Sequence, residues 1–239
     1  MPIRSECGSG GEEACALVKR KGEDETRLNA AARAEAMRHA QSFALFKAFG
    51  YDMDAVRWGV MRAAGKIGEP VLDVGTGPGG RMACVLASSG LRVTTIDVSD
   101  VVRDVARARA RERGFLERIE FLVMDAGAMS FDDGTFAAAV GVNILHDVER
   151  AARVVEEMAR VTRTGGRVVV ADLNPKGRVL VDRVHQILSH VHPAGPLDWR
   201  RDVERRLEKR GVAWKRLETE WLTVIVGTKR RTAARVSHA

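Results

Sequence analysis

A glycine-rich segment follows a short apolar run and precedes a run of helix-forming residues. Gly75, Gly77 and Gly80 have the G-x-G-x-x-G spacing, directly after the β-type run Val71–Val74. Glycines at this spacing permit a tight turn and let the backbone approach a ligand closely. A nucleotide-like ligand is therefore expected over this turn, although a strand and a helix that merely pack closely are an alternative.

Asp73 stands two residues before the first of these glycines and separates two classes of ligand. Dinucleotides place a pyrophosphate over such a turn, whereas S-adenosylmethionine places an ammonium and a sulfonium centre near it. A carboxylate repels the first group and attracts the second. Pro78 gives weaker support, because proline removes an amide donor that an anion at a helix start would use. These residues favour S-adenosylmethionine.

Two further acidic residues follow the next two β-type runs. Asp97 stands 22 positions after Gly75, where a carboxylate can accept hydrogen bonds from both ribose hydroxyls. Asp125 follows the third run, where its carboxylate can accept from an adenine amino group while the Ala126 amide donates to the ring. A helix cap for Asp97 and a surface turn for Asp125 are the structural alternatives.

Four segments resemble, in order, the successive motifs of class I S-adenosylmethionine-dependent methyltransferases: 73–79, 96–99, 125–126 and 165–170. The resemblance covers about residues 70–229. It implies an α/β fold with a doubly wound, seven-stranded, mostly parallel sheet and an antiparallel C-terminal strand. One departure is Phe136-Ala137, where the family often has Phe-Asp at the start of the fourth strand.

The resemblance also implies the residues that bind the methyl donor S-adenosylmethionine. Its methionine end would lie against the glycine loop, its ribose and adenine would lie beyond the second and third strands, and the fourth strand would end near the methyl group. The implied residues are Asp73, Gly75, Thr76, Gly77 and Gly79 for the loop, Asp97 and Val98 for the ribose, Asp125 and Ala126 for adenine, and Asn143 near the methyl group.

The loop after the fourth strand, residues 143–147, is expected to face the methyl acceptor, because it opens at the same sheet edge as the glycine loop. His146 is the candidate general base, with Asp147 beside it, and a positioning or packing role is the alternative for this histidine. Phe46 and Trp58 are candidates for an apolar lid over the acceptor, although aromatic residues at helical spacing are commonly core. No metal site is expected from the cysteine and histidine spacings.

Short β-branched runs alternate with helical patterns after residue 70, which predicts a parallel sheet. The last two runs predict an antiparallel hairpin. A helical N-terminal cap is expected before the sheet, over residues 27–49 and 53–66. The predicted strands are 71–74, 92–97, 118–124, 137–142, 167–172, 212–218 and 221–228, and the predicted later helices are 81–89, 101–113, 148–162, 179–191 and 199–210.

The chain of 239 residues is expected to form one α/β domain with appendages. Residues 1–26 lack periodicity and predict a flexible leader, residues 27–66 the helical cap, and residues 67–239 the cofactor-binding core. Three scattered cysteines and the absence of an apolar N-terminal run indicate a cytoplasmic protein with no membrane segment. The oligomeric state stays open.

The net charge of +7 comes from the C-terminal region, where residues 200–239 hold twelve Lys or Arg against five Asp or Glu. The leading hypothesis is a methyltransferase acting on a small molecule. A second hypothesis is an RNA methyltransferase that uses this basic region, although basic helices interleaved with Glu are commonly solvated faces. A non-catalytic S-adenosylmethionine-binding module and a nucleotide-dependent oxidoreductase are two further hypotheses.

Overall fold

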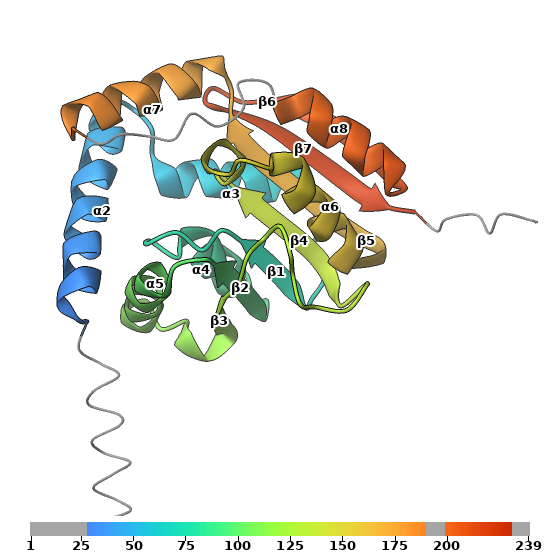
Figure 1. Cartoon of the computed structure of the whole chain (residues 1–239), viewed down its shortest axis with the longest axis horizontal. Helices are drawn as coiled ribbons and strands as arrows, with labels where there is room; N and C mark the ends of the chain where they lie inside the picture. The colour runs from blue at the N-terminus through green and yellow to red at the C-terminus, as the bar shows by residue number, and fades with distance from the viewer. Residues whose placement is uncertain (1–27, 190–198, 231–239) are drawn as a thin grey trace, which may run out of the picture.

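A seven-stranded sheet forms the centre of the protein (Figure 1), and its strand order is β3-β2-β1-β4-β5-β7-β6. The computed structural model describes residues 28–189 and 199–230. β7 runs antiparallel to both β5 and β6, and the other neighbouring strands are parallel. This confirms the predicted fold class. The strands are β1 (Val71–Val74), β2 (Val93–Asp97), β3 (Ile119–Val123), β4 (Phe136–Val142), β5 (Thr162–Leu173), β6 (Val212–Glu218) and β7 (Leu222–Lys229).

Helices cover both faces of this sheet (Figure 1). One face carries α3 (Met53–Ala64), α4 (Arg81–Ser88), α5 (Asp100–Glu112) and α7 (Pro175–Ile187). The other carries α6 (Ala151–Val161) and α8 (Trp199–Lys209). α2 (Ala30–Ala48) contacts α5 and α7, so it spans the edge at which β1 and β4 end. Two short 3₁₀ turns, η1 (Leu116–Arg118) and η2 (Leu145–Asp147), precede β3 and follow β4.

Alternate residues of the central strands face two separate apolar clusters. In β1, Val71 belongs to the cluster under α3, α4 and α7, whereas Leu72 and Val74 belong to the cluster under α6 and α8. In β5, Val169 and Val168 divide in the same way. A strand buried on both faces needs apolar residues at consecutive positions, which explains the unbroken β-branched runs of the sequence.

Several element boundaries differ from the predicted ones, and three starts are instructive. α6 begins at Ala151 instead of 148, because residues 145–147 form the η2 turn. β5 begins at Thr162 instead of 167 and so includes Gly166; a Cβ there would lie 2.7 Å from the carbonyl oxygen of Ala137. α7 begins at Pro175 instead of 179, since Asn174 caps it by accepting a hydrogen bond from the Gly177 amide.

The N-terminal helices occur close to the predicted positions. α2 starts after Asn29, whose side chain accepts from the Ala32 amide, and α3 starts after the cap residue Asp52. Gly65, with a φ of 69°, ends α3. The predicted leader, residues 1–26, lies outside the described residues. None of the helices within 28–189 and 199–230 is long and apolar enough to cross a membrane.

Candidate active site

The glycine loop after β1 has a backbone that only glycine adopts readily. Gly75, Gly77 and Gly80 have φ angles of 84°, 60° and 54°, in the left-handed region that is strained for other residues. A Cβ on Gly75 would lie 2.8 Å from Cδ1 of Ile144, so the loop also lies close to the residues after β4. The sequence spacing therefore reflects both a turn and a close approach.

Asp73 supports this loop from beneath. Its side chain is fully buried, and its Oδ2 accepts a hydrogen bond of 2.8 Å from the Thr95 hydroxyl. The Thr95 hydroxyl lies 2.7 Å from that of Thr76, which joins the loop to β2. Burial raises the pKa of Asp73 to about 7. Asp73 therefore lies one layer behind the loop, and its contact with the methionine end of the cofactor stays a prediction.

The residues predicted for ribose and adenine lie along the ends of β2 and β3. Asp97 is half-buried and accepts from the amides of Gly77 (3.0 Å) and Ser99 (3.2 Å). Asp125 is exposed and accepts from Gly127 at 2.7 Å. Val98 is 70% exposed, whereas Ala126 is buried. Asp97 and Asp125 thus make the local hydrogen bonds of a turn or cap, and Asp97 also contacts the glycine loop through Gly77.

A cavity of about 270 Å³ lies between the glycine loop and the N-terminal helices. Gly75–Gly79 form one wall, and side chains of α2 and α3 form another. Residues after β4 close it from the third side. The predicted residues in its wall are Gly75, Thr76, Gly77, Gly79, Asn143, His146, Asp147 and Phe46. We call it the donor cavity.

Positively charged and polar groups of the N-terminal helices line the donor cavity. Arg57 donates to the Met53 carbonyl at 2.9 Å, and its buried Nε has no hydrogen-bond partner. Arg81 is buried and pairs with Asp54 at 2.7 Å. Burial and the nearby Arg81 lower the pKa of His39 to about 4, so this imidazole is neutral at pH 7. Arg57 is thus a buried cation without an ion pair among the described residues.

Asn143 connects the end of β4 to the N-terminal helices. Its φ is 58°, an uncommon value for a residue other than glycine, and such conformations cluster at functional sites. Its Nδ2 donates to the hydroxyl of Tyr51 at 2.8 Å, and its buried Oδ1 has no partner. Tyr51 is itself buried and stacks at an angle on Phe46, with 5.5 Å between ring centroids. Asn143 therefore presents an unsatisfied acceptor to the donor cavity.

His146 is held by a buried carboxylate. Its Nδ1 lies 2.6 Å from Oδ1 of Asp172, at the end of β5. Asp172 is fully buried and also accepts from the backbone amides of Leu145 and Leu173. Burial lowers the pKa of His146, but the charge and hydrogen bond of Asp172 and the charge of Asp147 outweigh it, so the net pKa lies above the ordinary value.

Two predicted acceptor-side residues have different positions. Phe46 is buried and lines the donor cavity. Trp58 is 41% exposed and is absent from the cavity wall, because it lies on the outward side of α3. The structure thus separates these two members of the predicted lid.

Sequence reasoning missed two residues of the site, Arg57 and Asp172. Asp172 ends an apolar strand, as Asp97 does, so its position at the carboxyl edge of the sheet was a usable signal. Arg57 lies inside an amphipathic helix with many other arginines nearby in the sequence, and nothing in its spacing distinguishes it. Among the described residues, no group of three or more His, Cys, Asp or Glu could hold a metal ion.

The described part of the basic C-terminal region is rich in ion pairs. Arg205 contacts Asp202 at 2.6 Å, and Arg216 contacts Glu204 at 3.0 Å. Arg206 pairs with Glu156 of α6. These arginines act within the protein surface, which weakens the electrostatic argument for RNA. Residues 231–239 of this region lie outside the described part of the chain.

Known proteins with similar sequences are methyltransferases. Residues 72–170 match the methyltransferase domain family. The phosphatidylethanolamine N-methyltransferase of Cereibacter sphaeroides is 34% identical over 140 residues, covering 58% of this chain and 67% of that protein. A demethylmenaquinone methyltransferase of Clavibacter sepedonicus is 32% identical over 120 residues, covering 50% of this chain and 47% of that one. The chain thus spans between about half and two thirds of these relatives.

Solved structures with similar folds have lower sequence identity. The [4+2]-cyclase SpnF aligns with a TM-score of 0.59 and 18% identity over 74% of this chain and 80% of that one. Geranyl diphosphate C-methyltransferase from Streptomyces coelicolor A3(2) aligns with a TM-score of 0.55 and 19% identity over 73% and 77%. At such identities the likeness establishes the fold, and the cyclase illustrates that one fold hosts different reactions.

The strand order, the glycine loop at the end of β1 and the acid at the end of β2 define an α/β protein that binds a nucleoside-containing cofactor. Together with the sequence relatives, they show that the chain belongs to the class I S-adenosylmethionine-dependent methyltransferases. Its cofactor is S-adenosylmethionine. The donor cavity fits this ligand, since Arg57 Nε is a buried donor and Asn143 Oδ1 a buried acceptor, and both lack partners. A carboxylate and an ammonium group satisfy them together.

Proposed function

We propose that this protein methylates a small molecule, with His146 as the general base. The observation that carries the proposal is the position of His146, which lines the donor cavity together with the glycine loop while Asp172 holds its Nδ1. A histidine that only packs needs no buried carboxylate at 2.6 Å. An imidazole oriented in this way is typical of a group that accepts a proton.

Arg57 and Asn143 would hold the methionine end of the cofactor. The Arg57 guanidinium would bind the carboxylate, and Asn143 Oδ1 would accept from the ammonium group. Gly75, Thr76, Gly77 and Gly79 would form the wall beneath, with Asp73 behind them. When bound, S-adenosylmethionine supplies a methyl carbon whose bond to sulfur breaks with the electron pair remaining on sulfur.

His146 would remove the proton of the acceptor. Because Nδ1 faces the Asp172 carboxylate, the proton of a neutral His146 stays on Nδ1 and Nε2 is the acceptor atom. Asp172 then stabilises the imidazolium that forms. Asp147, with Oδ2 3.6 Å from Nε2, adds to this stabilisation and lies at the open side of the cavity. The acceptor is therefore a hydroxyl or another group that loses a proton on methylation.

Adenosine would bind along the ends of β2 and β3. Asp97 would accept from the ribose hydroxyls with the lone pairs that the amides of Gly77 and Ser99 leave open. Val98 would cover the ribose, and Asp125 with Ala126 would contact adenine.

A small acceptor is favoured by the names of the relatives. The two relatives above are named for phosphatidylethanolamine and for demethylmenaquinone. We place the protein in the cytoplasm, which the buried free thiol of Cys84 supports, and keep residues 27–66 as cap and 67–239 as core.

A methyl-transfer screen tests this function. The full chain is incubated with radiolabelled S-adenosylmethionine and either a panel of small metabolites or RNA. We expect label on small molecules and its loss in a His146→Ala variant that still binds the cofactor. Label on RNA alone would support an RNA methyltransferase, and binding without transfer to any acceptor would support a non-catalytic module. In calorimetry, NAD binding without S-adenosylmethionine binding would contradict the whole proposal.

A further inference from the structure

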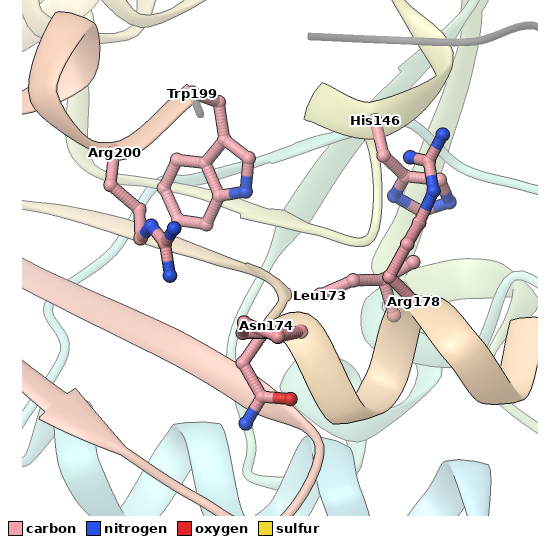
Figure 2. A pocket seen from close by; sticks show the side chains of 7 residues that line it. His146, Leu173, Asn174, Arg178, Trp199 and Arg200 are labelled. Atoms are coloured by element: carbon pink, nitrogen blue, oxygen red, sulfur yellow. The ribbon is translucent and has the colours of Figure 1, made fainter. Parts of the chain in front are cut away.

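A second cavity lies beside His146, away from the glycine loop. Its volume is about 280 Å³, and it is bounded by η2 and by the first turns of α7 and α8. Figure 2 shows the side chains of His146 and Arg178 on one side of it and those of Trp199 and Arg200 on the other. His146 lines both cavities, so the second cavity extends the site toward the end of β5.

Two arginines line this cavity. The wall contains Arg178 and Arg200, and the described residues that line it include no carboxylate. Asp182 approaches Arg178 at 3.5 Å, but its side chain is 54% exposed and lies outside the wall. Asp172 lies behind His146, where backbone amides and the imidazole use its oxygens. The charged side chains among the described residues of this wall are thus Arg178 and Arg200.

The rest of the wall is apolar or already hydrogen bonded. Trp199 is 3% exposed and Leu173 is 7% exposed, and both present apolar surface beside the arginines. Asn174 is occupied by its neighbours, since it accepts from Gly177 and donates to the carbonyl of Thr219. A flat, apolar body with an anionic group at one end would satisfy such a wall, because it would contact an aromatic surface and a guanidinium together.

We infer that the second cavity binds the methyl acceptor, and that the acceptor is a planar, apolar molecule with a carboxylate or phosphate group. The anion would pair with Arg178, the body would lie on Trp199, and the group to be methylated would reach His146. This inference rests on the proposed function, because it makes His146 the junction between donor and acceptor. It adds a substrate class that the donor side does not define.

Calorimetry with matched probes tests the inference. The probes are 4-hydroxycinnamate, its neutral amide and phenyl phosphate, each titrated into the full chain with and without S-adenosylhomocysteine. We expect at least one anion to bind about tenfold more tightly than the amide, as a charge-assisted hydrogen bond contributes this much. Whichever anion binds more tightly identifies carboxylate or phosphate. Equal affinities for acid and amide, or no binding of either anion, would overturn the inference.

Variants on one helix locate the anion. Arg178→Gln should abolish the preference for the anion, whereas Arg183→Gln should retain it. Arg183 provides a matched control, because it lies on α7, makes the same charge change and stacks on Phe49 outside the cavity. A preference that survives Arg178→Gln would contradict the inference. Binding of S-adenosylhomocysteine is measured in the same samples. A failure to bind it would count against the proposed function, and the probe affinities would still decide the inference.

Discussion

The donor and acceptor sides of this site are built in different ways. On the donor side, the glycine loop and the ends of β2 and β3 use backbone groups, as when Asp97 fixes the amide of Gly77. On the acceptor side, each important contact joins side chains from distant segments. His146 meets Asp172, which lies 26 positions away on the next strand. A backbone motif defines the donor, whereas tertiary packing defines the acceptor.

This difference explains why the donor and acceptor sides tolerate change differently. The donor loop needs left-handed backbone angles, which few residue types provide. The acceptor side needs only that the appropriate side chains meet, and other side chains at the same positions would create other sites. The likeness to a cyclase on the same fold is consistent with this view.

The largest expected effect falls on the acceptor side. His146→Ala should lower kcat about 10²- to 10⁴-fold, the usual contribution of a general base. The affinity for S-adenosylmethionine should stay unchanged, because the proposed cofactor contacts come from the loop and from Arg57. Steady-state kinetics and calorimetry check both parts. A variant with nearly full activity would reduce His146 to a packing residue.

On the donor side, Gly75→Ala should weaken S-adenosylmethionine binding about 10- to 100-fold. An alanine at a φ of 84° costs roughly 1–2 kcal/mol, and its Cβ would also collide with Ile144. Gly90→Ala is the control, because Gly90 has a φ of 87° and a Cβ there would meet nothing within 4 Å. Both variants should lose stability, but only Gly75→Ala should lose cofactor affinity in calorimetry. Equal affinities would separate the loop from the donor site.

The fold and the donor loop could be predicted because local sequence determines them. Glycine at 75, 77 and 80 and β-branched runs buried on both faces leave few other folds open. The start of β5 was less predictable, because only the fold shows that a carbonyl beside Gly166 leaves no room for a Cβ. The contacts of Arg57 and Asp172 also come from neighbours that folding brings to them, and the exposure of Trp58 depends on how α3 packs.

Asp172→Asn should change the pH dependence of the reaction. The pKa of His146 lies above its ordinary value, so kcat should rise as pH increases through this raised pKa and deprotonates the base. Asn at 172 removes the charge that opposes burial, so the rising limb should move to lower pH and kcat should fall about tenfold with the weaker base. A pH–rate profile measures both. An unchanged limb would show that another group limits the rate.

The raised pKa of His146 also makes the stability of the fold depend on pH. A histidine whose pKa is raised in the folded state contributes stability that is fully present below the unfolded pKa of about 6.5. That contribution is lost as pH rises through the folded pKa. Thermal unfolding of wild type should therefore show a stability term that declines with pH above about 6.5, and Asp172→Asn should lack this term.

The smallest expected effect concerns the boundary between the two sides. Phe46 lines the donor cavity and contacts Tyr51, which in turn binds Asn143. Phe46→Leu keeps much of the buried volume and should change the ratio of kcat/KM between two acceptors of different size about threefold to tenfold, as expected for small changes in an apolar pocket. Cofactor affinity should change less, because Phe46 offers it no polar group.

Trp58→Leu is the matched control for Phe46→Leu, since Trp58 lies on the next helix, is 41% exposed and is absent from the cavity wall. Its acceptor ratio should equal that of wild type. If Phe46→Leu instead weakened the cofactor and left the acceptor ratio unchanged, Phe46 would belong to the donor side, and the contact through Tyr51 to Asn143 would be the reason. If Trp58→Leu changed the ratio, α3 would have to turn toward the acceptor during the reaction. The first outcome would place Phe46 with Tyr51 on the donor side, and the second would place α3 next to the acceptor.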